Sequence, residues 1–399
     1  MNRLIRSAAP LAALLAVSAC NAGGTSGVPS APQAGAQSAR SQMPDWQAKN
    51  LATPACPQVV GVPTCMALIQ SKSGISRSIA GLQPSDFQTR YDLPSSTNGA
   101  GQIVAIVDAY DNPNVASDLA AYRSEFGLGA ATFSKYNQNG QQSGYPHGSV
   151  GWGVEIDLDV QMVSAACPKC TIYLVEANSS TSSDLQSAEV EAVKLGAHIV
   201  SNSWSCLGSD SCVSASDFDT PGVVYLAASG DSGYNHIGAP AVLTSVVSVG
   251  GTVLTKNGSK YSETVWNDAG AGCSLIKKPS WQKDPDCKNR TVADISAVAW
   301  NVAEYDTYGY SGWFTVGGTS VATPLNAAVF GLAGNASSLT EPQAIWSATQ
   351  ATRKANLNTI SSGSDGSCSG EYLCTAGTHQ YRTYSGPSGW GTPLGIGLY

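Results

Sequence analysis

Histidine and charged side chains are scarce in this chain, which has four histidines and 12% charged residues among its 399. Lysine and arginine together number 21 against 28 aspartates and glutamates, and the longest run of basic residues is two. A net charge of −7 without a basic cluster argues against binding to nucleic acid or to anionic membrane surfaces. No nucleic-acid partner is therefore expected.

Long apolar runs are also lacking, and the apolar segment at the N-terminus is short. The positive stretch Met1-Asn-Arg-Leu-Ile-Arg6 precedes an apolar run that ends at Val17, too short for a membrane span. A small-residue cleavage site follows, so residues 1–20 are predicted to be an export signal. Residues 17–20 also resemble a bacterial lipobox, which would attach a lipid to Cys20. We expect an extracytoplasmic protein, either an envelope lipoprotein anchored at Cys20 or, after cleavage at Ala19, a secreted one.

Ten cysteines remain after Cys20, and they occur in close pairs. Five local disulfides are the simplest prediction for an exported chain, although the sequence leaves the connectivity open. The pair Cys167-Pro-Lys-Cys170 could instead be redox-active or bind a metal, but no second such pair or histidine lies at zinc-site spacing. The pairs are Cys56/Cys65, Cys167/Cys170, Cys206/Cys212, Cys273/Cys287 and Cys368/Cys374.

The composition changes along the chain and predicts its organisation. Residues 21–54 are rich in Gly, Ser, Pro and Ala, which predicts a flexible tether. Residues 55–80 hold the first cysteine pair and a short apolar segment, 66–69, and predict an ordered lead-in. Residues 81–399 are long enough to bury a large core and are predicted to form one domain.

From residue 81 onward, apolar runs typical of buried strands alternate with segments of helical periodicity. This alternation predicts an α/β fold with a doubly wound, mostly parallel sheet and helices on both faces. Active sites in such sheets lie beyond the carboxyl ends of the strands. The expected strands are 102–108, 171–175, 198–203, 223–228 and 245–249, and the expected helices are 115–126, 154–166 and 183–195.

A candidate nucleophile lies in Gly317-Gly318-Thr319-Ser320. This turn joins an aromatic-rich run, 311–316, to a small-residue segment of helical periodicity, 325–333. The serine would then lie at a helix N-terminus, where free backbone N–H groups and the helix dipole favour an oxyanion. An ordinary capping serine is the structural alternative, so the interpretation depends on finding a base.

Histidine is a poor candidate for that base. His198 opens a predicted buried strand, and His236 and His379 lie in Gly/Ser-rich loops. His147 directly precedes a predicted helix. Together with Asp108, at the end of the first strand, it leaves open a subtilisin-type Ser/His/Asp arrangement.

Carboxylates offer a better arrangement. Glu155 and Asp159 lie four residues apart on one helix face that borders the core, with Asp157 roughly 200° away. Two acids in such a place repel each other unless they share a proton or serve chemistry. A further acid, Asp231, follows a buried strand in Ser-Gly-Asp-Ser-Gly and alone would be a turn aspartate.

These features, in this order, resemble the sedolisin family of serine-carboxyl peptidases, whose fold is related to subtilisin. The resemblance covers about residues 81–399. It is carried by Glu155-x-x-x-Asp159, by Ser-Gly-Asp231-Ser-Gly, by Arg290-Thr-Val-Ala-Asp-Ile-Ser-Ala297 and by Gly-Gly-Thr-Ser320-x-Ala-x-Pro324.

The resemblance implies a serine-type endopeptidase that hydrolyses polypeptides. Ser320 would be the nucleophile, Glu155 the general base, Asp159 the acid that orients Glu155 and shares its proton, and Asp231 the oxyanion donor. Trp204 would lie at the edge of the substrate cleft and would link Asp108 to Glu155. Because a carboxylate is a weak base and Asp231 donates only when protonated, an acidic pH optimum is expected.

Two departures from the family pattern accompany the resemblance. The family's C-terminal calcium site uses two aspartates, which here are replaced by Thr359 and Ser385, so neither calcium nor another cofactor is expected. Residues 21–80 are short for the family's folded prodomain, which makes activation by removal of such a domain doubtful.

A monomer is expected, and an inactive envelope binding protein on the same fold is the alternative from a different functional class.

Overall fold

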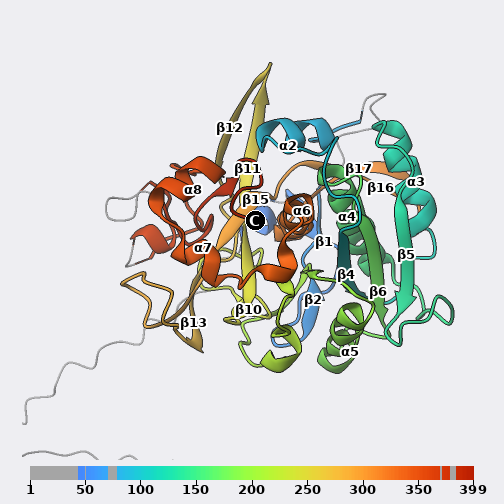
Figure 1. Ribbon diagram of the computed structural model, residues 1–399, viewed down its shortest axis with the longest axis horizontal. Coiled ribbons are helices and arrows are strands. Elements are labelled where there is room, and N and C mark those ends of the chain that lie inside the picture. Colours follow the sequence, from blue (N-terminus) through green and yellow to red (C-terminus); the bar gives the residue numbers. More distant parts are fainter. Residues whose placement is uncertain (1–43, 50, 71–78, 369–370, 378–382) are drawn as a thin grey trace, which may run out of the picture. The chain divides into compact units, whose positions relative to one another are not determined.

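The computed structural model describes residues 44–49, 51–70, 79–368, 371–377 and 383–399. Its main sheet has the order β12-β11-β9-β7-β4-β6-β5, with β15 pairing with β11 (Figure 1). Every pair is parallel except β11 with β12, so the predicted mostly parallel α/β sheet is confirmed. The strands are β4 Ile103–Ala109, β5 Thr132–Asn137, β6 Thr171–Ala177, β7 Ile199–Asn202, β9 Val224–Ala228, β11 Val246–Asn257, β12 Lys260–Val265 and β15 Ile295–Val298.

Helices cover both faces of this sheet because β4 is apolar on both sides. Val104 and Ile106 belong to one core cluster with residues of α3, α4 and α6, while Ala105 and Val107 belong to a second cluster with residues of α5. Successive side chains of a strand point to opposite faces, so the two clusters lie on opposite sides of the sheet. The helices are α3 Val115–Glu125, α4 Val150–Ala166, α5 Ser182–Lys194 and α6 Thr319–Ala333.

Smaller elements surround the sheet. The region between β12 and β15, expected to be rich in loops, contains the hairpin of β13 Gly272–Lys277 and β14 Asn289–Val292. The remaining helices are α1 Asp45–Ala48, α2 Pro84–Arg90, α7 Gln343–Ser347 and α8 Gln350–Asn356, and β18 Leu357–Asn358 pairs with β19 Thr392–Pro393. No helix in the described part of the chain is long and apolar enough to cross a bilayer.

Residues 52–70, here called the N-terminal strap, carry β1 Ala52–Pro54, β2 Pro63–Cys65 and β3 Leu68–Gln70. Strand β3 joins a small sheet of order β1-β3-β17-β16, with β16 Val302–Asp306 and β17 Gly312–Gly317. Strand β2 pairs with β8 Trp204–Leu207, which also pairs with β10 Gly238–Ala239. Two short elements, α1 and β1, lie within the residues 21–54 that were expected to form the tether.

All five predicted cysteine pairs form disulfides, and each closes a local loop. The Cys167/Cys170 pair is buried, which leaves no thiol at that place to bind a metal. Disulfides persist in oxidising compartments, which agrees with a protein that works outside the cytoplasm. Cys20 lies outside the described residues.

Candidate active site

Ser320 is the second residue of α6, directly after the turn from β17. Gly318 caps the helix at φ 117°, a conformation that glycine adopts without strain, and Ser320 is fully buried. The Ser320 hydroxyl donates to the Ser203 carbonyl at 3.3 Å. The predicted position at a helix N-terminus is therefore present.

Glu155 and Asp159 extend from α4, which packs directly against α6, and both are fully buried. The Ser203 hydroxyl donates to Asp159 Oδ1 at 2.7 Å, so Ser203 contacts both the serine and the acid. Glu155 Oε1 and Asp159 Oδ2 have no hydrogen-bond partner. Two buried acids with unpaired oxygens can share a proton between them.

Asp231 approaches the same turn from β9. Thr319 donates to Asp231 Oδ1 through its backbone N–H at 2.7 Å and its hydroxyl at 2.8 Å. These bonds leave Asp231 Oδ2 buried and unpaired. A Cβ atom at Gly318 would lie 2.7 Å from that oxygen, so glycine is required for this approach.

Burial raises the pKa of every acid at this site. It raises the pKa of Asp108 to about 8 and that of Asp231 to about 7, although the Thr319 hydrogen bonds oppose the rise at Asp231. Burial and then the charge of Asp108 raise the pKa of Glu155 well above its usual value, while Ser320 lowers it. The pKa of Asp159 rises well above its usual value for the same two reasons. Asp108 and Asp231 therefore hold their protons into the neutral range.

The alternative triad through histidine does not assemble. Both carboxylate oxygens of Asp108 are buried without a hydrogen-bond partner, so Asp108 does not orient His147. The His147 ring packs on Tyr110, with 4.9 Å between ring centroids. His198 bonds the Gly222 carbonyl, and His236 that of Tyr234. His379 lies outside the described residues.

Trp204 is fully buried, and its indole N–H donates to the Val107 carbonyl at 3.2 Å. It does not bond Asp108, so the expected link from Asp108 to Glu155 through Trp204 is absent. The backbone of Trp204 pairs with Cys65 of the strap. Its side chain instead packs inside the protein, edge-on to Phe218.

The strap fills the space in front of Ser320, which the sequence had not predicted. Met66 N–H donates to the Ser203 carbonyl at 3.1 Å, and Ala67 N–H donates to Glu155 Oε2 at 2.7 Å. The Met66 carbonyl oxygen lies 2.1 Å from the point that a Cβ of Gly318 would occupy. The apolar segment 66–69 beside a cysteine pair was the available sequence signal, but nothing in it specified the partner.

A second group of acids lies on the other side of α4. Carboxylate oxygens of Asp118, Asp157 and Asp306 lie within 4.8 Å of one another, and all three residues are buried. Asp157 is thus buried, although helical spacing places it on the face of α4 away from Glu155. Such a group of oxygens could surround a cation, yet Asp118 is satisfied by the backbone and hydroxyl of Thr307.

The two C-terminal positions expected to have lost calcium ligands, Thr359 and Ser385, have different surroundings. Thr359 is exposed, whereas Ser385 is buried and its hydroxyl bonds that of Ser388 at 2.6 Å. Neither residue supplies the carboxylate oxygen that calcium prefers. The Cys368–Cys374 disulfide closes a loop between these positions.

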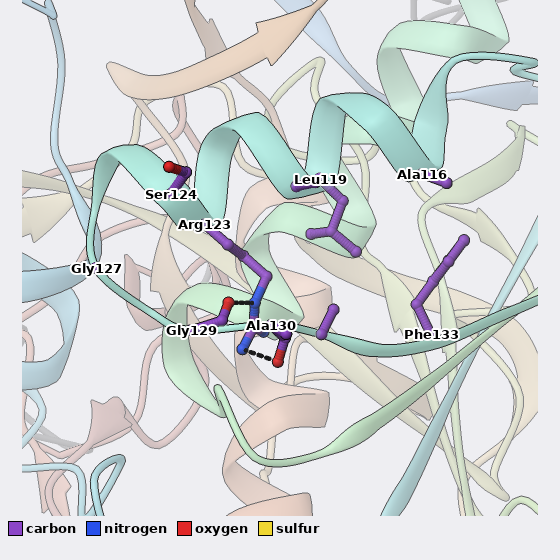
Figure 2. A pocket seen from close by; sticks show the side chains of 10 residues that line it. Ala116, Leu119, Arg123, Ser124, Gly127, Gly129, Ala130 and Phe133 are labelled. Carbon is purple, nitrogen blue, oxygen red and sulfur yellow. Dashed lines mark hydrogen bonds between the residues drawn. The ribbon is translucent and has the colours of Figure 1, made fainter.

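A hollow of about 750 Å³ between α3 and the segment leading into β5 is separate from these acids (Figure 2). Its one charged residue, Arg123, uses its guanidinium on backbone carbonyls, including those of Gly129 and Ala130. Arg123 also donates to Ser164 on α4 at 2.6 Å. This arginine therefore braces the loop after α3.

Known proteins resemble this chain in both sequence and fold. The chain is 31% identical to kumamolisin of a Bacillus species over 291 residues, which are 62% of this chain and 51% of that protein. It is 27% identical to sedolisin of a Pseudomonas species over 355 residues, which are 78% of this chain and 60% of that protein. The chain thus spans half to three fifths of the curated relatives it matches. No family model matches it.

Among solved structures, Pseudomonas sedolisin, a serine-carboxyl proteinase in complex with pseudo-iodotyrostatin, superposes with a TM-score of 0.65 and 25% identity. The match covers 79% of this chain and 96% of that one. Sphericase, with a TM-score of 0.51 and 18% identity, shares the fold alone. This chain is therefore similar in sequence to the sedolisin family of serine-carboxyl peptidases and has the same subtilisin-like fold.

Proposed function

We propose that this protein is a serine-type endopeptidase that cleaves polypeptides best in acid. One observation carries the proposal: a peptide bond, Met66–Ala67, already lies across the site. Its amide donates to Glu155 and its carbonyl oxygen lies against Gly318. The site therefore accommodates an extended peptide backbone in the place where hydrolysis requires one.

Each side chain then has a role that follows from its surroundings. Ser320 attacks the carbonyl carbon while Glu155 accepts the hydroxyl proton, and Glu155 later returns that proton to the departing amine. Asp159, held by Ser203, faces Glu155 from the next helical turn and shares its proton. Asp231 Oδ2, the unpaired oxygen, donates to the tetrahedral oxyanion when it is protonated.

The acidic optimum follows from the oxyanion donor. The pKa of Asp231 is raised to about 7, so the donor is protonated in acid and lost as the pH rises through that value. Glu155 must be ionised to accept the proton of Ser320, which sets the acidic limit of activity. The coupled acids therefore favour a bell-shaped profile below neutral pH.

Two alternatives are less well supported. A Ser/His/Asp mechanism would need Asp108 to orient His147, and Asp108 has no hydrogen-bond partner. An inactive binding protein would have no need for Glu155, Asp159 and Asp231 to meet Ser320 around one turn. No cofactor is required by the proposed reaction. We propose export through residues 1–20 and anchoring at Cys20, both outside the described residues, and a monomeric enzyme.

The test is hydrolysis of a quenched peptide from pH 3 to 8, after the full chain has been incubated near pH 4. We expect maximal cleavage in acid and none by Ser320→Ala, with both proteins equally folded by circular dichroism. A maximum near pH 8 with no activity at pH 4 would rule out the carboxylate mechanism.

A further inference from the structure

Ser203 joins β7 to β8 and is fully buried. Both of its neighbours in the chain are anchored to other parts of the protein. The Asn202 amide donates to Glu189 of α5 at 3.1 Å, and the Trp204 indole donates to the Val107 carbonyl at 3.2 Å. Ser203 is therefore held in place from both sides.

Three parts of the site meet at Ser203. Its carbonyl oxygen accepts hydrogen bonds from the Ser320 hydroxyl at 3.3 Å and from Met66 N–H of the strap at 3.1 Å. Its hydroxyl donates to Asp159 Oδ1 at 2.7 Å. One residue thus contacts the nucleophile, the bound peptide and the acid that faces Glu155.

The hydrogen bond from Ser203 is the one that the described residues give to Asp159. Asp159 Oδ2 is buried without a partner. The Ser203 hydroxyl also lies 3.4 Å from the Ser320 carbonyl oxygen, but the contact with Asp159 is shorter and its acceptor can be charged. Burial and the charges of Asp108 and Glu155 raise the pKa of Asp159, whereas the Ser203 hydroxyl lowers it. Ser203 therefore favours the ionised form of this acid.

The charged groups that face the Glu155/Asp159 pair are other acids. Asp108 faces it from β4, Glu304 from β16 and Asp231 from the loop after β9, while neither α6 nor the strap carries a charged side chain. Other charged residues on the elements around α4 have partners elsewhere: Asp86 and Arg90 of α2, Asp118 and Arg123 of α3, Glu176 of β6 and Asp306 of β16. Among the described residues, the pair thus has hydrogen bonds rather than a cation to favour its ionised form.

We propose that Ser203 is a positioning residue whose hydroxyl keeps the Glu155/Asp159 pair singly ionised in acid, so that Glu155 can accept the Ser320 proton. This inference rests on the proposed peptidase function. While the pair holds one proton, its negative charge is divided between the two acids, and Ser203 stabilises the share on Asp159. When Glu155 takes the proton of Ser320, the pair becomes neutral and the charge passes to the oxyanion beside Asp231.

Removing this hydroxyl has a defined effect on the pH profile. Without it, the ionised form of the pair loses a donor, so the second proton binds at a higher pH. The acidic limit of activity, at which the pair becomes fully protonated, therefore moves to higher pH. One hydrogen bond to a charged group corresponds to about one pH unit. The alkaline limit depends on Asp231 instead and should not move.

The experiment measures kcat/KM on a quenched peptide from pH 3 to 8, with the full chain incubated near pH 4 beforehand. In Ser203→Ala we expect the acidic limit to rise by about one pH unit. Ser203→Thr keeps the hydroxyl and should restore the wild-type limit. Ser201→Ala is the matched control, because Ser201 of β7 is also fully buried but its hydroxyl has no partner. All three substitutions keep the backbone contact with Ser320.

The outcomes separate this proposal from the proposed function. If wild type and Ser203→Ala both cleave the peptide with the same acidic limit, the role of Ser203 is wrong and the peptidase function stands. A loss by the same factor at every pH would also refute it, because that is the effect of a merely structural serine. An equal shift in Ser201→Ala would assign the effect to packing. If wild type cleaves nothing between pH 3 and 8, the proposed function fails and this inference fails with it.

Discussion

The two faces of α4 both carry buried acids, but their surroundings differ. On one face, Glu155 and Asp159 meet Ser203 and the strap backbone, which donate hydrogen bonds to them. On the other face, Asp157 accepts from Asn112 at 2.6 Å and lies beside Asp118 and Asp306. No lysine or arginine among the described residues pairs with either set. Burial alone therefore does not distinguish a catalytic acid from a structural one.

What distinguishes the two faces is access to a peptide bond. On the first face, Glu155 accepts a hydrogen bond from the N–H of Ala67, which belongs to a peptide bond of the strap. The second face is closed by β16, on which Glu304 is fully buried with both oxygens unpaired. Burial, and then the charges of Asp306 and Asp157, raise the pKa of Glu304 well above its usual value. The second face therefore holds buried acids, among them Asp157, Glu304 and Asp306 with raised pKa values, and none of these three accepts a hydrogen bond from the described strap residues.

Matched substitutions on the two faces test this distinction most strongly. Glu155→Gln removes the proton acceptor for Ser320 and is expected to lower the rate of peptide cleavage by about 10⁴-fold. Asp157→Asn, on the same helix, should leave that rate close to wild type, since it contacts no reacting group. The measurement is kcat/KM on a quenched peptide near pH 4. Equal losses in both variants would show that the two faces act as one network.

The helix that carries Glu155 and Asp159, and the Gly-Gly turn before Ser320, could be predicted from the sequence because their signals are local. Glu155 and Asp159 share a face because of helical periodicity, and Ser320 follows a Gly-Gly turn into a helix. The parallel sheet followed from alternating strand and helix patterns. The sequence could not reveal the strap, because β2 and β3 pair with strands that are far away along the chain.

Burial was the other quantity that local pattern did not supply. Helical periodicity placed Asp157 on the face of α4 away from Glu155. Protein surrounds this helix on all sides, so both of its faces are buried. The direction of the Trp204 side chain likewise depends on Phe218 and the Val107 carbonyl, which are remote in sequence. Tertiary packing, rather than periodicity, decides such cases.

The oxyanion donor offers a second, smaller test of the catalytic face. Asp231→Ala removes the donor and is expected to lower kcat by about 10²- to 10³-fold. Asp231→Asn should lose less, because its amide can donate at the unpaired position while its oxygen accepts from Thr319. The amide does not titrate, so the fall in activity near pH 7 should weaken in this variant. An unchanged pH profile in Asp231→Asn would contradict the role of Asp231 as a titrating donor.

The smallest expected effect concerns stability on the other face of α4. Burial raises the pKa of Asp306 to about 7, and that of Asp157 well above its usual value, whereas unfolded acids titrate near pH 4. Between these values the unfolded chain binds fewer protons than the folded one, so stability falls as the pH rises from 4 towards 7. We expect a higher melting temperature near pH 4 than at pH 7. Asp157→Asn cannot become charged and should recover about 1–2 kcal/mol of the difference at pH 7, or roughly 3 °C.

The control for this comparison is Glu125→Gln, which removes an exposed acid from α3 and should change neither melting temperature. Differential scanning calorimetry at both pH values, with and without a chelator, provides the measurement. Because the acids are neutral when protonated, the chelator should leave the melting temperature at pH 4 unchanged. A melting temperature that rises with pH, or one that a chelator lowers strongly at pH 7, would mean that the second face of α4 holds charged acids. In that case a bound cation, rather than protonation, would be what permits their burial.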